Sequence, residues 1–71
     1  SVHAGAGVNK GFAAAEVRDY ATAKKEWQKA AEQGDAVAQY IVGVMYDNGR
    51  VVLQNFTEVL KWYRLAALPF D

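Results

Sequence analysis

Apolar residues recur at helical spacing in four stretches of the chain, and glycine, proline or a capping residue separates the stretches. The first stretch runs from Val8 to Val17, the second from Tyr20 to Gln33, and the third from Ala36 to about Tyr46. The fourth follows Asn55 and ends before Pro69, because proline does not continue a helix. No stretch alternates apolar and polar residues as a half-buried strand does. The pattern therefore predicts an all-α fold.

The ends of these stretches carry their own signals. Residues 18–19 form a tight turn, and Gly34 stands where a left-handed C-terminal cap is needed. Asp35 is a natural N-cap for the third helix. Asn55, with Glu58 three residues later, predicts a capping box at the start of the fourth helix. These signals place short connections between helices, which is typical of antiparallel helix hairpins.

The 71 residues allow one domain. We expect a flexible N-terminal segment over residues 1–7 and a single domain over 8–71, built from stacked hairpins at 8–33 and 35–68. The third helix is apolar almost all round, so it is predicted to be central and surrounded by other helices.

The second and fourth helices are predicted to turn equivalent apolar faces inward. The face of the second helix comprises Tyr20, Ala23, Trp27, Ala30 and Ala31. The face of the fourth comprises Phe56, Val59, Leu60, Tyr63, Ala66 and Ala67.

The two predicted hairpins align as an internal repeat. Trp27 corresponds to Tyr63, 36 residues later, and the Ala-Ala pair at 30–31 corresponds to the pair at 66–67. Gly11 corresponds to Gly43, 32 residues later, and the difference is a loop inserted after the third helix. Small residues let two helices approach closely while aromatic rings fill the gaps between turns.

Composition narrows the function. Eight basic and eight acidic residues cancel, which is not the basic footprint of a nucleic-acid binder. No apolar run is long enough for membrane insertion. Cysteine is absent, and the lone histidine, His3, has no acid/base or nucleophile partner at a telling spacing. We therefore expect neither an enzyme nor a metal or cofactor site. Periplasmic, secreted and cytoplasmic locations all stay open, and so does a removed signal peptide.

Three sequence runs resemble the Sel-1-like repeat family, a relative of tetratricopeptide repeats with a longer loop between its two helices. They are residues 27–40 (WQKAAEQGDAVAQY), 43–49 (GVMYDNG) and 61–67 (KWYRLAA). The resemblance covers about residues 12–67, and the first hairpin looks more like an ordinary tetratricopeptide unit, an arrangement common in bacterial proteins of this family. It implies a right-handed superhelix and a protein–protein interaction adaptor, which binds a peptide or helix in a concave groove.

The tetratricopeptide geometry implied by this resemblance selects a groove on the first helix of each hairpin. Some of these residues would instead pack one hairpin against the other. The groove residues are Val8, Phe12, Ala15 and Glu16 from the first helix, and Val37, Tyr40, Val44, Asp47 and Asn48 from the third.

A second surface is predicted at the C-terminal end, where apolar residues extend beyond the face that the hairpin needs. A large uncovered apolar patch on a small domain predicts association, here a homodimer. Its residues are Trp62, Leu65, Leu68 and Phe70. The alternative to an adaptor is a self-associating or truncated repeat remnant with no distinct partner.

Overall fold

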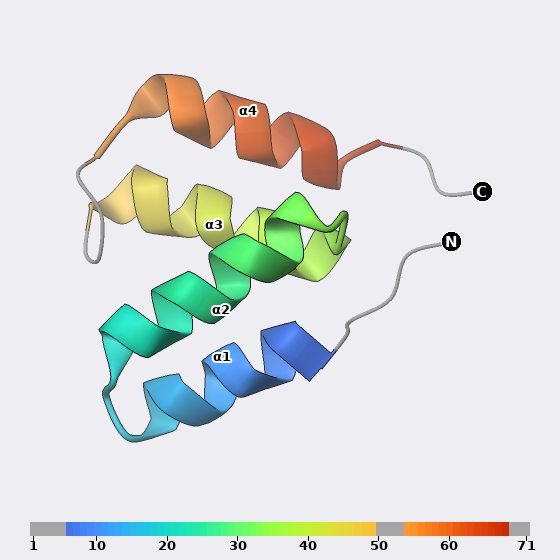
Figure 1. Cartoon of the computed structure of the whole chain (residues 1–71). Coiled ribbons are helices and arrows are strands. Elements are labelled where there is room, and N and C mark those ends of the chain that lie inside the picture. The colour runs from blue at the N-terminus through green and yellow to red at the C-terminus, as the bar shows by residue number, and fades with distance from the viewer. Residues whose placement is uncertain (1–5, 50–53, 69–71) are drawn as a thin grey trace.

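The computed structural model describes residues 6–49 and 54–68, and within them it contains helices α1 (Ala6–Glu16), α2 (Tyr20–Glu32), α3 (Ala36–Asn48) and α4 (Phe56–Ala66). No strand occurs in the described ranges. Each helix packs against the next one in the chain, and neighbours run in opposite directions (Figure 1). The predicted all-α class is confirmed.

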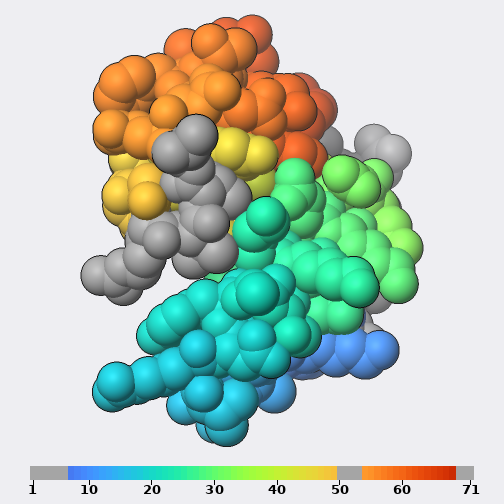
Figure 2. All heavy atoms as spheres, turned by 60° about the vertical axis from the view of Figure 1, so that its left-hand side comes forward, coloured from blue at the N-terminus to red at the C-terminus, as the bar shows by residue number. Residues whose placement is uncertain are grey.

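The four helices form a thin slab whose principal extents are 35 × 27 × 14 Å. Helices α2 and α3 contact each other and join the α1–α2 hairpin to the α3–α4 hairpin. Figure 2 shows the same order in spheres, with green α2 between blue α1 and the yellow and orange spheres of α3 and α4. The shortest extent is close to the ~10–12 Å diameter of one helix, so much of each helix surface faces solvent.

The helix boundaries differ from the predicted ones by one residue at the ends of α1 and α2 and by two residues at two other places. Helix α1 begins at Ala6, so Ala6 and Gly7 are helical although they fall in the segment predicted to be flexible. Helix α3 continues to Asn48 and is closed by Gly49, which has φ 65° and donates its N–H to the Met45 carbonyl at 3.0 Å.

The junction between α2 and α3 is a Schellman motif fused to an N-cap. Gly34 has φ 97° and donates its N–H to the Ala31 carbonyl, while the N–H of Asp35 donates to Ala30, both at 3.1 Å. The Asp35 carboxylate then accepts the N–H of Ala38 at 3.1 Å. One residue therefore closes α2 through its backbone and opens α3 through its side chain, as the sequence predicted for Gly34 and Asp35.

The junction between α1 and α2 repeats this arrangement without a glycine. Arg18 has φ 63° and donates its N–H to Ala15, and Asp19 donates to Ala14, both at 2.9 Å. The Asp19 carboxylate accepts the N–H of Thr22 at 3.2 Å. Because a side chain at positive φ is strained, this junction holds Arg18 in a conformation that favours glycine.

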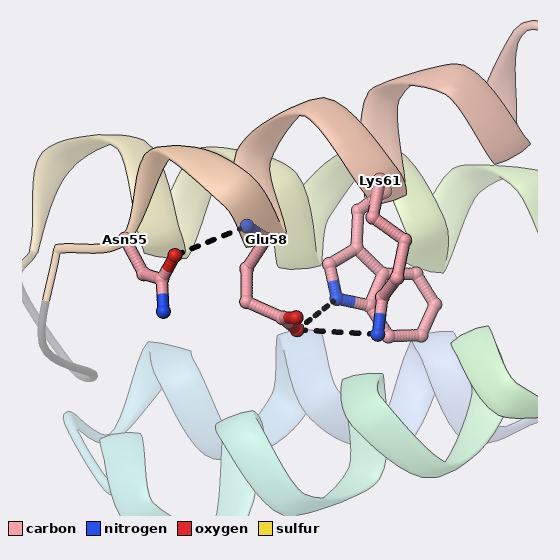
Figure 3. Close-up of polar contacts among 4 residues, drawn as sticks. Asn55, Glu58 and Lys61 are labelled. Carbon is pink, nitrogen blue, oxygen red and sulfur yellow. Dashed lines mark hydrogen bonds and ion pairs between the residues drawn. The ribbon is translucent and has the colours of Figure 1, made fainter.

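Helix α4 has the predicted N-cap but only half of the predicted capping box. The Asn55 side chain accepts the N–H of Glu58 at 3.2 Å (Figure 3). The reciprocal bond is absent, because the Asn55 N–H donates instead to the Tyr46 carbonyl of α3 at 3.3 Å. The Glu58 carboxylate is directed to Trp62 and Lys61. The start of α4 is thereby tied to the end of α3.

The core is built mainly from small side chains and one large one. Gln39 is buried within it and its side-chain N–H donates to the Ala31 carbonyl at 3.2 Å, which also accepts the Gly34 N–H at the end of α2. Helix α3 is not surrounded as predicted, since Val37 and Tyr40 are exposed. The buried cluster comprises Val8, Ala30, Ala31, Ala38, Val42, Met45 and Trp62.

Each hairpin places a glycine of its first helix against an aromatic ring of its second. A Cβ atom on Gly11 would overlap the indole of Trp27, and one on Gly43 would lie 2.5 Å from two carbons of the Tyr63 ring. Both glycines are buried. The equivalence of Gly11 with Gly43 and of Trp27 with Tyr63, predicted from the sequence, therefore holds as a repeated contact.

Gly43→Ala is expected to destabilise the fold by about 1–3 kcal/mol, because the added methyl group overpacks the contact with Tyr63. The direction of the stability change is informative, because replacing glycine by alanine at a helix position with space for a Cβ stabilises by about 1 kcal/mol. Urea unfolding monitored by circular dichroism measures the change. An unchanged or higher stability would show that the ring of Tyr63 does not lie against Gly43.

Arg18→Gly is expected to stabilise the fold by about 1 kcal/mol, because it removes the strain of a side chain at positive φ. Gly34→Ala should destabilise by a similar amount through its backbone conformation alone, since a Cβ there would meet no atom within 4 Å. Arg18→Ala is the control, because it removes the charge but keeps the Cβ. Equal stabilities for Arg18→Gly and Arg18→Ala would contradict the prediction.

Candidate functional site

The predicted groove residues on α1 divide into one buried and several exposed side chains. Val8 is fully buried, and its carbonyl accepts the Trp27 indole N–H at 3.1 Å. Val8 is therefore a core residue, and its placement in a binding surface was wrong. Phe12 is 44% exposed and packs edge-on against Trp27 at 5.5 Å between ring centroids. Glu16 is exposed and Ala15 is half-buried.

The predicted groove residues on α3 are exposed except for Val44, which is half-buried. Tyr40 is 58% exposed and stacks on Tyr63 of α4, with 5.5 Å between centroids and 28° between planes. Val37 is 42% exposed. Asp47 and Asn48 are exposed at the end of the helix.

Tyr63 is the inner ring of the second aromatic pair. Partial burial raises the pKa of Tyr63 above its usual value of 10.0, and the negative charge of Asp47 and the neighbouring Tyr40 hydroxyl add to the rise. The Asp47 backbone carbonyl also accepts the Gln54 side-chain amide at 2.8 Å. The structure thus brings Tyr40, Tyr63 and Asp47 into one neighbourhood.

The two hairpins present the same local arrangement, although the rings occupy different sequence positions. In each, a half-exposed ring on the first helix rests on a ring from the second helix, Phe12 on Trp27 and Tyr40 on Tyr63. The inner ring in turn lies against the buried glycine. Each exposed ring is therefore packed on one side against a neighbouring ring.

The predicted self-association surface is only partly exposed. Trp62 is 5% exposed and belongs to the core, so its assignment to that surface was wrong. Its indole N–H donates to the Glu58 carboxylate at 3.2 Å, which also pairs with Lys61 at 3.2 Å (Figure 3). Leu65 and Leu68 are 37% and 54% exposed, as a surface role requires. Phe70 lies outside the described residues.

Helix α4 is rotated relative to the predicted orientation. Phe56 and Leu60, predicted to face inward, are 66% and 61% exposed, whereas Val59 and Trp62 are buried. A hollow on this outer side is lined by Thr57, Leu60, Lys61, Arg64 and Leu65. The internal repeat indicates that Leu60 faces outward, because Leu60 corresponds to Lys24 of α2, a charged residue.

The outer side of α2 is basic. Its hollow is lined by Ala21, Gln28 and Glu32 together with three lysines, Lys24, Lys25 and Lys29. These lysines are exposed or half-buried, in keeping with a solvated helix face.

The described residues contain no group of three or more His, Cys, Asp or Glu side chains arranged to hold a metal ion. Within residues 6–49 and 54–68, no helix combines the length and apolar character needed to cross a membrane. Every buried side-chain nitrogen or oxygen in those ranges has a hydrogen-bond partner.

Comparison of the chain with family models, with curated proteins and with solved structures gave no match.

Trp62→Ala is expected to destabilise the fold by about 3–5 kcal/mol, because it empties a core position and leaves Glu58 without the indole donor. Leu65→Ala, at an exposed position of the same helix, should change stability by about 0.5 kcal/mol. Thermal unfolding by circular dichroism compares the two. Similar stabilities of the two variants would show that Trp62 is a surface residue after all.

Proposed function

We propose that this chain is a non-catalytic protein–protein interaction module that binds a peptide or helix of another protein on the exposed side of α1 and α3. The observation that supports this most is the pair of half-exposed, packed rings, Phe12 and Tyr40. Aromatic side chains held rigidly at a surface offer large contact area at low entropic cost, and they are enriched where proteins bind one another.

The proposed surface combines these rings with aliphatic and acidic side chains. Val37 is exposed at the start of α3, and the carboxylates of Glu16 and Asp47 are exposed near the ends of α1 and α3. An apolar strip with acidic ends fits a ligand that inserts apolar side chains and carries cationic residues beside them. The groove proposed here omits Val8, which is buried.

We also propose membership of the Sel-1-like repeat group with a tetratricopeptide-like superhelix. The repeated glycine–ring contact supports this, since Gly11 against Trp27 recurs as Gly43 against Tyr63. The successive packing of α1 on α2, α2 on α3 and α3 on α4 is the contact pattern that a stack of hairpins produces.

A quantitative pull-down tests the proposed function. The Phe12→Ser/Tyr40→Ser variant and the unmodified chain are used as baits in extract from the source cells, with mass spectrometry of the captured proteins. Tyr20→Ser is the matched control, because Tyr20 is 42% exposed but lies on α2. We expect a partner whose recovery falls at least about tenfold with the double variant, the equivalent of ~1.4 kcal/mol, and is unchanged with Tyr20→Ser.

Circular dichroism of the double variant must match that of the unmodified chain, so that loss of binding is not loss of fold. Capture that is the same for all three baits would contradict the proposed groove. Recovery of nothing except further copies of this chain would favour the self-associating alternative.

A further inference from the structure

The outer face of α4 carries exposed apolar side chains, although the inner side of the helix is already packed. Val59 and Trp62 are buried, yet Phe56 and Leu60 of α4, and Leu68 just beyond its end, are more than half exposed. Exposed apolar side chains gathered on one helix mark an interaction site. Leu60 stands three residues before Tyr63, whose ring packs on Tyr40 of α3, and Lys61 and Leu65 extend the face away from that contact.

The side chains of this face form two rows with a shallow channel between them. Thr57, Lys61 and Leu65 stand four residues apart in one row, and Leu60 and Arg64 stand four apart in the other. All five line one hollow. Rows with this spacing are the ridges that interdigitate when two helices pack, so the shape fits a helix better than an extended peptide.

The charge on this face selects the kind of helix. The hollow has two cationic residues, Lys61 and Arg64, and no carboxylate among its lining residues. Glu58 pairs with Lys61 at 3.2 Å from the edge of the face, and the Lys61 side chain remains half exposed. Arg64 makes no ion pair with a described residue. An incoming helix with carboxylates beside its apolar stripe would complement both cations.

The α2 and α4 helices of a second copy do not supply such a helix. The outer face of α2 carries Lys24, Lys25 and Lys29, and a second α4 would bring Lys61 and Arg64 against like charges. The α1 and α3 surface of a second copy has exposed apolar side chains with Glu16 and Asp47, so the peptide-free chain must sediment as a monomer if the occupant is another protein.

We propose that the outer face of α4 is a docking site for an acidic amphipathic helix of another protein, separate from the aromatic surface on α1 and α3. Leu60 and Leu65 contact its apolar stripe, and Lys61 and Arg64 contact its carboxylates. This site does not depend on the function proposed for Phe12 and Tyr40, because it uses a different set of side chains.

Two synthetic helical peptides test the proposal. Each has about 16 residues, enough for four turns, with the same leucine stripe and either glutamates or lysines beside it. Titration into the ¹⁵N-labelled chain, followed by amide chemical shifts, reports affinity and location together. We expect the glutamate peptide to bind at least about tenfold more tightly than the lysine peptide, to move the amides of α4, and to weaken with added salt.

Variants make the test specific. Leu60→Ser and Arg64→Gln should each weaken the glutamate peptide several-fold, and both change exposed side chains. Lys61→Glu/Arg64→Glu should reverse the preference toward the lysine peptide. The matched control is Lys25→Glu/Gln28→Glu, which alters the corresponding positions of α2 and should leave binding unchanged. Circular dichroism checks that each variant folds. If Lys61→Glu/Arg64→Glu does not fold, the single variant Arg64→Gln provides the test.

Three results would overturn the proposal. The first is equal affinity for the two peptides, and the second is a shift map centred on α1 and α3. The third is sedimentation of the peptide-free chain as a dimer that Leu60→Ser dissociates, because a second copy would then be the occupant. Loss of peptide binding in Phe12→Ser/Tyr40→Ser would instead assign the peptide to the aromatic surface.

Discussion

The close approach of a glycine to an aromatic ring is the contact on which the rest of this structure depends. Gly11 and Gly43 are buried, and the space a Cβ would occupy is filled by Trp27 and Tyr63. Because the two helices of each hairpin approach this closely, large side chains from both do not fit between them. Alanines therefore supply much of the core. The fixed inner rings then support Phe12 and Tyr40 at the surface. The candidate binding surface is therefore a consequence of the same contact that holds each hairpin together.

Local signals determined what the sequence could predict. Gly34, Asp35 and Asn55 act on backbone groups within a few residues of themselves, so their capping roles follow from the sequence alone. The internal repeat predicted that Gly11 corresponds to Gly43 and Trp27 to Tyr63, and the structure adds that each glycine contacts the ring of its own hairpin. The all-α class and the helices could also be predicted from the sequence. The half-formed capping box does not, since the Tyr46 carbonyl that takes the Asn55 N–H is brought there by tertiary packing.

The rotation of α4 and the burial of Val8 were missed because their causes lie outside the local pattern. The apolar residues of α4 cover more than half of its circumference, so the helical period does not fix which of them face inward. Trp62 faces inward in part because Glu58, four residues earlier, accepts the indole N–H that burial would otherwise leave unpaired. Val8 is covered because Trp27 spans from α2 to its carbonyl. The resemblance assigned Val8 to a groove by position, whereas in the structure Val8 belongs to the core cluster against which Trp27 packs.

The thinness of the slab explains why so many apolar side chains remain at the surface. With a shortest extent of 14 Å, the fold offers an apolar residue only the seam between neighbouring helices. The glycine–ring contacts and alanines already fill those seams, so Phe56, Leu60 and Tyr40 stay outside. A chain this small gains little stability from its own core, and any partner that covers these residues binds the folded state alone. A partner of the kind proposed would therefore stabilise the folded chain as its concentration rises.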